Sequence, residues 1–278
     1  VNSLLGWDLN VNLPPKAAEG RAAQVAYITK LTAEKWLDPE FKSLLQKMNE
    51  PSVARSTTSI RLSTGSLRAF AGEEAAILRN LNWLGKYYYR VPKEIIVEFA
   101  ETSATAFMVW QKAKLENKFQ DFLPFLKKIV KLNQMIAQHL GYKENPYDAL
   151  LDLYEPGLTA SFCQKIFADL CPKLTQILKK ISGSAGLAKA KELYSLIDPS
   201  LVYPLGDQKQ LALFVLRKMG YDLEAGRMDV SAHPFTTTLD RFDVRITNRY
   251  QALDFQDSLM VAMHEGGHAL YELGVNRQ

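Results

Sequence analysis

The sequence predicts a mainly α-helical protein with one small antiparallel β element, placed directly before the last helix. Apolar residues recur at three- and four-residue intervals through most of the chain, and Pro, Gly, Ser or Asn stands where those helices would begin or end. The one clear β-rich stretch lies between residues 225 and 249. At 278 residues the chain is long enough to bury a substantial core, so we expect a multi-helical fold.

The helices expected before residue 225 are delimited by proline and glycine. Pro14 and Pro15 precede the first, because proline suits the first helical turn, and Gly141 ends another as a C-terminal stop. We expect helices at residues 16–37, 41–49, 67–89, 92–119, 122–140, 146–153, 160–181, 187–196 and 207–219. Residues 182–186 form a glycine-containing turn, but no strand precedes it, so a phosphate-binding loop is not indicated.

The β-rich stretch predicts a short antiparallel hairpin. Residues 236–238 and 244–247 favour strands, and a polar turn at 240–242 separates them. Because the hairpin comes directly before the last helix, its edge strand could hold an extended peptide by backbone hydrogen bonds. Alternatively, it is a connecting hairpin with no ligand role, and the spacing alone does not choose between these two interpretations.

Composition and charge are those of an ordinary soluble globular protein, with 47% hydrophobic and 23% charged residues. The net charge of +4 is too small and too dispersed to indicate nucleic acid as a partner. Lys127, Lys128 and Lys131 form the densest basic run, and its spacing is typical of the solvated face of an amphipathic helix rather than of a binding patch. No apolar run reaches the roughly 18 residues of a membrane-spanning helix, so no membrane partner is expected.

The only two cysteines are predicted to be free thiols. If one helix carries both Cys163 and Cys171, their separation of eight positions places them about 12 Å apart, too far for a disulfide. Free thiols are typical of the reducing cytoplasm, and no secretory signal is visible at the N-terminus. Because the chain begins with Val1 rather than Met, we expect its true N-terminus to lie upstream or to have been trimmed.

The last predicted helix, residues 254–274, carries a pattern that indicates a metal site. His264 and His268 stand four residues apart, so a helix places both imidazoles on one face, where they can bind one metal ion. Glu265 lies at the flank, where it can act as a general base toward a metal-activated water, as in a zinc peptidase. Gly266 and Gly267 each destabilise a helix interior by about 1 kcal/mol, which indicates close approach by another element or a substrate. The alternative is a surface helix with two solvated histidines.

The third metal ligand is not found on this helix. Glu272 lies near the face of His268 but about 12 Å along the axis from His264, so we assign it an outer or structural role. No upstream glutamate is favoured by its pattern. Two histidines alone leave a metal ion under-coordinated.

Two further residues are candidates for contact with a substrate. Arg245 alternates with two apolar residues of its strand, and its guanidinium suits the terminal carboxylate of a peptide, although an ion pair with Asp243 is the alternative. His233 precedes a proline in a turn, where a structural role and a role at the active site are both open.

Taken together, these stretches resemble the thermostable (Taq-type) metallocarboxypeptidases. The resemblance extends over most of the chain and is carried by LLGWDLNVNLPPKAAEGRAAQ at 4–24, NPYDALLDLYEPG at 145–157, GRMDVSAHPF at 226–235, DVRITNRY at 243–250 and HEGGHALYELG at 264–274. It implies a multi-helical metallopeptidase architecture, one divalent metal ion per site (zinc, or cobalt) and a homodimer. It also implies release of single C-terminal amino acids, with broad specificity, from peptides that have a free C-terminus. His264 and His268 would be metal ligands and Glu265 the base, while His233 and Arg245 fall in motifs that border the active site.

The chain departs from the family pattern chiefly in length. Family members are longer, and their third ligand is a glutamate on a following helix, within a His-Glu-Ser motif that is absent here. Leu13-Pro14-Pro15 replaces Met-Pro, and Asn248 replaces a threonine. We therefore expect residues 1–278 to be one apparently truncated helical catalytic domain, with a helical scaffold at 1–224 and the hairpin and metal-site helix at 225–278. Such a fragment is expected to be inactive or weakly active.

Two other functions stay open at the level of the sequence. One is a non-catalytic pseudo-enzyme or interaction module that keeps the metal-site helix as a scaffold. The other is an endopeptidase that uses the same helix.

Overall fold

The computed structural model describes residues 1–49, 73–195 and 200–275, and it is mainly helical with one small sheet. The chain divides into two compact units, Val1–Ala18 with Cys171–Gln278, and Glu19–Leu170. The many helices and the single small sheet confirm the predicted fold class. The organisation as one catalytic domain stays a prediction.

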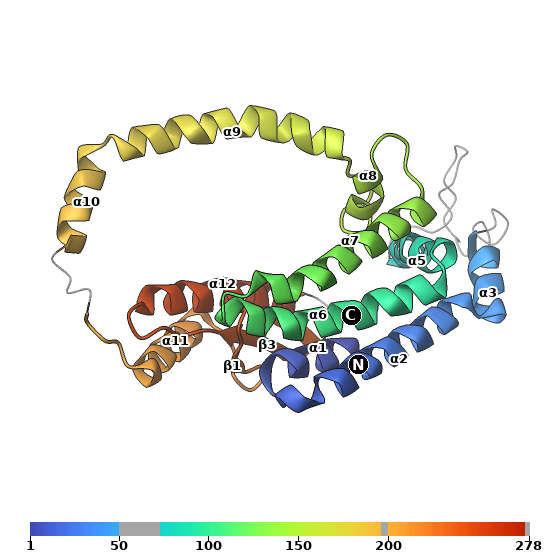
Figure 1. Ribbon diagram of the computed structural model, residues 1–278, viewed down its shortest axis with the longest axis horizontal. Helices are drawn as coiled ribbons and strands as arrows, with labels where there is room; N and C mark the ends of the chain where they lie inside the picture. The colour runs from blue at the N-terminus through green and yellow to red at the C-terminus, as the bar shows by residue number, and fades with distance from the viewer. Residues whose placement is uncertain (50–72, 196–199, 276–278) are drawn as a thin grey trace. The chain divides into compact units, whose positions relative to one another are not determined.

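The unit Glu19–Leu170 is built from helices alone among its described residues. They are α2 (Ala18–Leu37), α3 (Pro39–Asn49), α5 (Glu73–Arg90), α6 (Lys93–Leu115), α7 (Phe119–Leu140) and α8 (Pro146–Leu151). Helices α6 and α7 lie side by side, as Figure 1 shows, and α5 and α8 pack on α7. Their shared core contains Val91, Ile95, Ile96, Leu132, Ile136, Ala137, Leu140 and Ala149. The predicted helix at 67–89 is confirmed from residue 73 onward, and its first six positions lie outside the described residues.

The predicted helix boundaries are confirmed where a particular side chain or glycine forms the cap. Gly141 ends α7 with a φ of +80°, a conformation that suits glycine. The Asn145 side chain accepts a hydrogen bond from the Tyr147 amide at the start of α8. Thr159 Oγ1 accepts one from the Phe162 amide (3.2 Å), which begins α9 (Ala160–Ser182). Helix α9 runs across the boundary between the two units and is followed by α10 (Ala185–Ser195).

Helix α9 carries both cysteines, which are free thiols as their spacing predicts.

Within the described ranges, no helix combines the length and the hydropathy that are needed to cross a bilayer.

The other unit contains the sheet and the predicted metal-site helix. Its elements are α1 (Asn2–Val11), the short 3₁₀ turn η1 (Pro15–Ala17), α11 (Leu205–Met219), β1 (Met228–Val230), β2 (Thr236–Asp240), β3 (Asp243–Asn248) and α12 (Phe255–Gly274). Helix α1 was not predicted, because no side chain caps its start and its sequence lacks a clear apolar stripe.

The sheet has the strand order β1-β3-β2 and is mixed. Strands β2 and β3 form the predicted antiparallel hairpin, with Thr236 opposite Ile246 and Thr238 opposite Val244. The expectation of a single antiparallel element was incomplete, because β1 adds a parallel partner to β3. A three-residue strand whose partner lies some eighteen positions away in sequence has no local signal that would reveal it (Met228 pairs with Ile246).

Helices α11 and α12 pack together, and α12 also lies on β2 and β3 (Figure 1). The core between them contains fully buried side chains, among them Ala212, Leu216, Val244, Ile246, Ala262 and Ala269. Gly266 belongs to this interface, since a Cβ there would lie 2.5 Å from Leu216 Cδ2, whereas a Cβ on Gly267 would meet no atom within 4 Å. The close approach predicted for the glycine pair is therefore confirmed for Gly266, and the approaching element is α11.

Gly266→Ala and Gly267→Ala should change stability in opposite directions. In each variant, replacing glycine by alanine stabilises the helix itself by about 1 kcal/mol. Only the Cβ on Gly266 meets the buried Leu216 side chain, and such overpacking destabilises a core by about 1–3 kcal/mol. Urea unfolding of the metal-free protein, followed by circular dichroism, should place Gly266→Ala below and Gly267→Ala above the wild type. Equal free energies of unfolding for the two variants would contradict this packing.

Candidate metal centre

Helix α12 presents the two predicted ligands outward because its other face is buried. The Asp254 carboxylate accepts a hydrogen bond from the Asp257 amide (3.1 Å) and so caps the helix N-terminus. From there the helical period exposes His264 and His268, while Ala262 and Ala269 face the core. The histidines therefore stand on a rigid element with both rings directed to one side.

The separation of the two imidazoles fits one tetrahedral metal ion. Nε2 of His264 lies 3.2 Å from Nε2 of His268, with the ring planes at 85° to each other. Two nitrogens, each about 2.0–2.1 Å from a tetrahedral zinc ion, would be about 3.3 Å apart. The pair thus matches the donor spacing of zinc or a similar divalent ion, and both residues are exposed.

A third protein ligand is not present among the described residues. Within them, no three His, Cys, Asp or Glu side chains are placed to share an ion. The Glu272 carboxylate instead accepts a hydrogen bond from Thr238 Oγ1 (3.2 Å), in agreement with the outer or structural role predicted for it. His233 is exposed in the turn before β2. Among the described residues, His264 and His268 are therefore the two candidate ligands, and no third one accompanies them.

Glu265 is directed into the protein rather than to solvent. Its residue is only 7% exposed, and its carboxylate Oε2 lies 2.6 Å from the hydroxyl of Thr236 on β2. Such a short bond to a charged acceptor is stronger than a neutral hydrogen bond. Thr236 was predicted only as a strand residue. The only sequence feature that could have indicated a role at the site is that Thr236 lies on the hairpin that precedes the helix.

The turn before β2 is held by the last threonine of the Asp-x-Arg-x-Thr motif. Thr247 Oγ1 accepts a hydrogen bond from the Phe235 amide (2.9 Å), and the Thr247 amide donates to the Phe235 carbonyl (2.9 Å). Ser231 Oγ lies 2.7 Å from Thr247 Oγ1 and 2.8 Å from the carbonyl oxygen of His233. Hydrogen bonds therefore join the Asp-x-Arg-x-Thr strand β3 to the His-Pro-Phe turn, and β3 fixes the position of this turn, which begins β2.

Arg245 is engaged within the protein. Its guanidinium makes two hydrogen bonds of 2.7 Å to the Asp243 carboxylate and lies 4.6 Å from the ring centroid of Trp7. The Arg227 guanidinium lies 5.2 Å from the centroid of the same ring. Because the Arg245 guanidinium donates to it and carries the opposite charge, the pKa of Asp243 lies below its ordinary value. The ion pair that the sequence left as an alternative is thus present, and the stacking attaches α1 to the sheet.

Buried polar side chains connect α12 to its neighbours. Asn248 Nδ2 donates to the Ser258 carbonyl oxygen (3.0 Å), and Ser258 Oγ donates to Gln208 Oε1 (3.0 Å) on α11. Gln208 in turn donates to the carbonyl oxygens of Tyr203 and Gln251. Because every member has a partner, the network fixes the start of α12 without an unsatisfied group.

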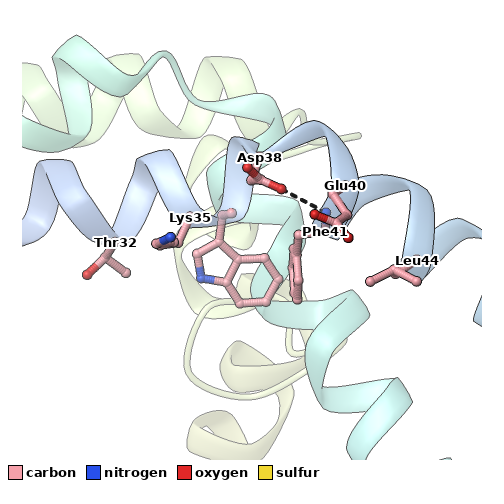
Figure 2. A pocket seen from close by; sticks show the side chains of 7 residues that line it. Thr32, Lys35, Asp38, Glu40, Phe41 and Leu44 are labelled. Atoms are coloured by element: carbon pink, nitrogen blue, oxygen red, sulfur yellow. Dashed lines mark hydrogen bonds between the residues drawn. The ribbon is translucent and has the colours of Figure 1, made fainter.

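A shallow cavity of about 530 Å³ lies in the other unit, at the corner between α2 and α3 (Figure 2). Trp36 lines it, stacked on Tyr88 and edge-on to Phe41. The Asp38 carboxylate beside it accepts a hydrogen bond from the Phe41 amide (3.0 Å) and caps α3. These contacts fix the helix corner, and the lining contains no histidine or cysteine.

A model of the family described as Carboxypeptidase Taq (M32) metallopeptidase matches residues 1–278. The chain belongs to this family. It is 37% identical over 274 residues to thermostable carboxypeptidase 1 of Pyrococcus furiosus, covering 98% of this chain and 51% of that protein. It is 33% identical over 291 residues to thermostable carboxypeptidase 1 of Thermus thermophilus, covering 100% of this chain and 52% of that protein.

The fold agrees with solved structures of similar proteins. The crystal structure of the protein called BsuCP superposes with a TM-score of 0.85 at 28% identity, covering 99% of this chain and 51% of that one. The chain therefore spans about half the length of the relatives it matches. The remaining half of those relatives has no counterpart in these 278 residues.

The 278-residue chain alone should bind zinc or cobalt weakly and through the histidine pair. Two imidazoles provide fewer contacts than the three protein ligands of catalytic zinc sites. His268→Ala should weaken Co²⁺ binding at least about tenfold, measured by titration calorimetry, since it leaves one ligand. His139→Ala, on α7, is the matched control and should leave the affinity unchanged. Tight, stoichiometric zinc binding by the chain alone would show that a third ligand exists within it.

The Asp243–Arg245 pair should make stability depend on acid pH. The pKa of Asp243 is lowered in the folded protein, so the pair's contribution is complete above the ordinary carboxyl pKa of 3.8 and is lost as pH falls through the folded value. Asp243→Asn should therefore destabilise the protein at pH 7 by about 1 kcal/mol or less, and hardly at all near pH 2. Urea midpoints at both pH values test this, with Asp240→Asn as the exposed control in the same hairpin. A deficit that is equal at both pH values would contradict it.

Proposed function

We propose that the protein of which this chain forms part is a metal-dependent carboxypeptidase that releases single C-terminal amino acids from peptides, with broad specificity. The observation that carries the proposal is the paired Nε2 atoms of His264 and His268 beside the buried Glu265, in a chain of the Taq carboxypeptidase family. Residues 1–278 are proposed to form the N-terminal half of one catalytic domain, with residues 225–278 carrying the metal-site side chains.

His264 and His268 would hold one divalent ion, with zinc favoured by two nitrogen donors and cobalt as an alternative. When bound, the ion supplies Lewis acidity to the scissile carbonyl and activates a water. Glu265 accepts the proton of the attacking water and delivers it to the leaving amine nitrogen. The completing ligand is proposed to be a glutamate from the part of the protein that the longer relatives contain.

The β2 edge and the residues around it are proposed to receive the peptide. Strand β2 stands at one edge of the described sheet and lies against α12, so it can pair with an extended substrate. His233 is exposed where β2 begins and is proposed to border the bound peptide. Arg245 is proposed to act on the substrate only if a carboxylate displaces Asp243 from its guanidinium, since the two hydrogen bonds to Asp243 occupy it.

The family resemblance also supports a homodimer and a cytoplasmic location as proposals. Two free thiols on α9 agree with a reducing compartment. Peptides with a free C-terminus are the proposed substrates, with neither nucleic acid nor a membrane as a partner.

Glu265→Gln should abolish hydrolysis by the full-length gene product while leaving its metal content intact. The amide keeps the size of the side chain but cannot accept a proton, and general-base catalysis contributes about 10²–10⁴-fold. Release of the C-terminal amino acid from a blocked dipeptide, together with metal analysis of the same samples, measures both effects. An unchanged rate in the variant would refute the assignment of Glu265.

The same assay separates the alternatives. A carboxypeptidase should fail on a peptide with an amidated C-terminus, whereas an endopeptidase should cleave it. A non-catalytic protein would bind no metal and would show no rate for Glu265→Gln to change.

A further inference from the structure

We propose that Thr236 is a positioning residue for Glu265, holding the carboxylate in the orientation in which it meets the attacking water. The inference rests on the proposed function, because it assigns Glu265 the role of base. It adds a residue outside the two histidines and the glutamate, on a different element of the fold.

The Thr236 hydroxyl lies within hydrogen-bond distance of the Glu265 carboxylate. Thr236 Oγ1 lies 2.6 Å from Glu265 Oε2 and 3.1 Å from the Glu265 carbonyl oxygen. The hydroxyl has one proton, and the shorter distance to a charged acceptor favours donation to the carboxylate. Among the described residues, this hydroxyl is the one side-chain partner of the Glu265 carboxylate.

A buried carboxylate needs such a donor. Glu265 is 7% exposed, and a buried polar group without a hydrogen bond is destabilising, so its carboxylate requires a donor from within the protein. Donation to Oε2 fixes one oxygen and leaves Oε1 free to accept a proton from water. Thr236 therefore defines which carboxylate oxygen is available for the reaction.

The position of Thr236 is itself fixed by strand β3. Thr236 is paired with Ile246 of β3, and the preceding Phe235 is held through both its amide and its carbonyl by Thr247. The Asp-x-Arg-x-Thr strand thus supports the His-Pro-Phe turn, and the turn supports the hydroxyl that reaches Glu265.

Thr238 provides an internal comparison. It stands two residues further on β2, on the same strand face, and its hydroxyl donates to Glu272, seven residues beyond Glu265 and on the same side of α12. Both threonines attach β2 to α12 by the same kind of bond. If the Thr236 bond served only this attachment, losing either hydroxyl would have the same consequence.

The test compares Thr236→Val, Thr236→Ser and Thr238→Val in the full-length, metal-loaded enzyme. We expect Thr236→Val to lower kcat by roughly 10–100-fold, the range for partners that orient the groups of a metal site, with KM changed less than about threefold. Thr236→Ser keeps the hydroxyl and should recover kcat to within about threefold of wild type. Thr238→Val should lose as much thermal stability as Thr236→Val, and its kcat should fall much less than that of Thr236→Val.

Zinc affinity, measured by equilibrium dialysis, is the readout that does not depend on activity. It should be equal in the wild type and all three variants, since the Thr236 hydroxyl is hydrogen-bonded to Glu265 and not to either histidine. If Thr236→Val does not fold, Thr236→Ala against Thr236→Ser makes the same comparison.

Equal kcat for Thr236→Val and Thr238→Val would overturn the proposal, as would a loss of zinc that accounts for the lost rate. A wild type that releases no C-terminal amino acid would instead overturn the proposed function. An active wild type, an inactive Glu265→Gln variant and a fully active Thr236→Val variant would overturn the role of Thr236 alone.

Discussion

The burial of one face of α12 against the sheet and α11 is the constraint on which the candidate site depends. A helix that packs Ala262, Gly266 and Ala269 inward presents its opposite face outward, and His264 and His268 lie on that face. Gly266 lets α11 approach closely enough for Leu216 to fill the interface. The direction of the metal-binding face is therefore a consequence of core packing rather than of any interaction between the histidines.

The motifs around the site act as successive supports for one another. Asp243 and Trp7 hold Arg245, which attaches α1 to β3, while Thr247 of the same strand holds the turn at Phe235. That turn begins β2, and β2 provides the hydroxyl that meets Glu265. Most of these side chains bind no ion and touch no substrate in the proposed mechanism. Their contribution is to restrict the positions available to the few that do.

Under the proposed function, the metal centre is divided along the chain. The described residues place two imidazoles at the spacing that one zinc ion requires, and they place no third ligand beside them. The relatives are about twice as long as this chain. A rigid helix that carries both histidines fixes their spacing, while the orientation of Glu265 depends on its hydrogen bond to Thr236 of β2. Under the same proposal, the completing ligand would approach two histidines whose spacing is already fixed.

Local pattern alone determined that α12 is a helix, that His264 and His268 share its exposed side, and that β2 and β3 form a hairpin before it. These features depend on the 3.6- and 2-residue periods and on single capping residues, all of which are visible in a short window of sequence. The tertiary structure decided the rest. The parallel strand β1, the stacking of Trp7 on Arg245 and the bond from Thr236 to Glu265 each join residues far apart in the chain. No period predicts such contacts, because they arise only when separate elements are packed together.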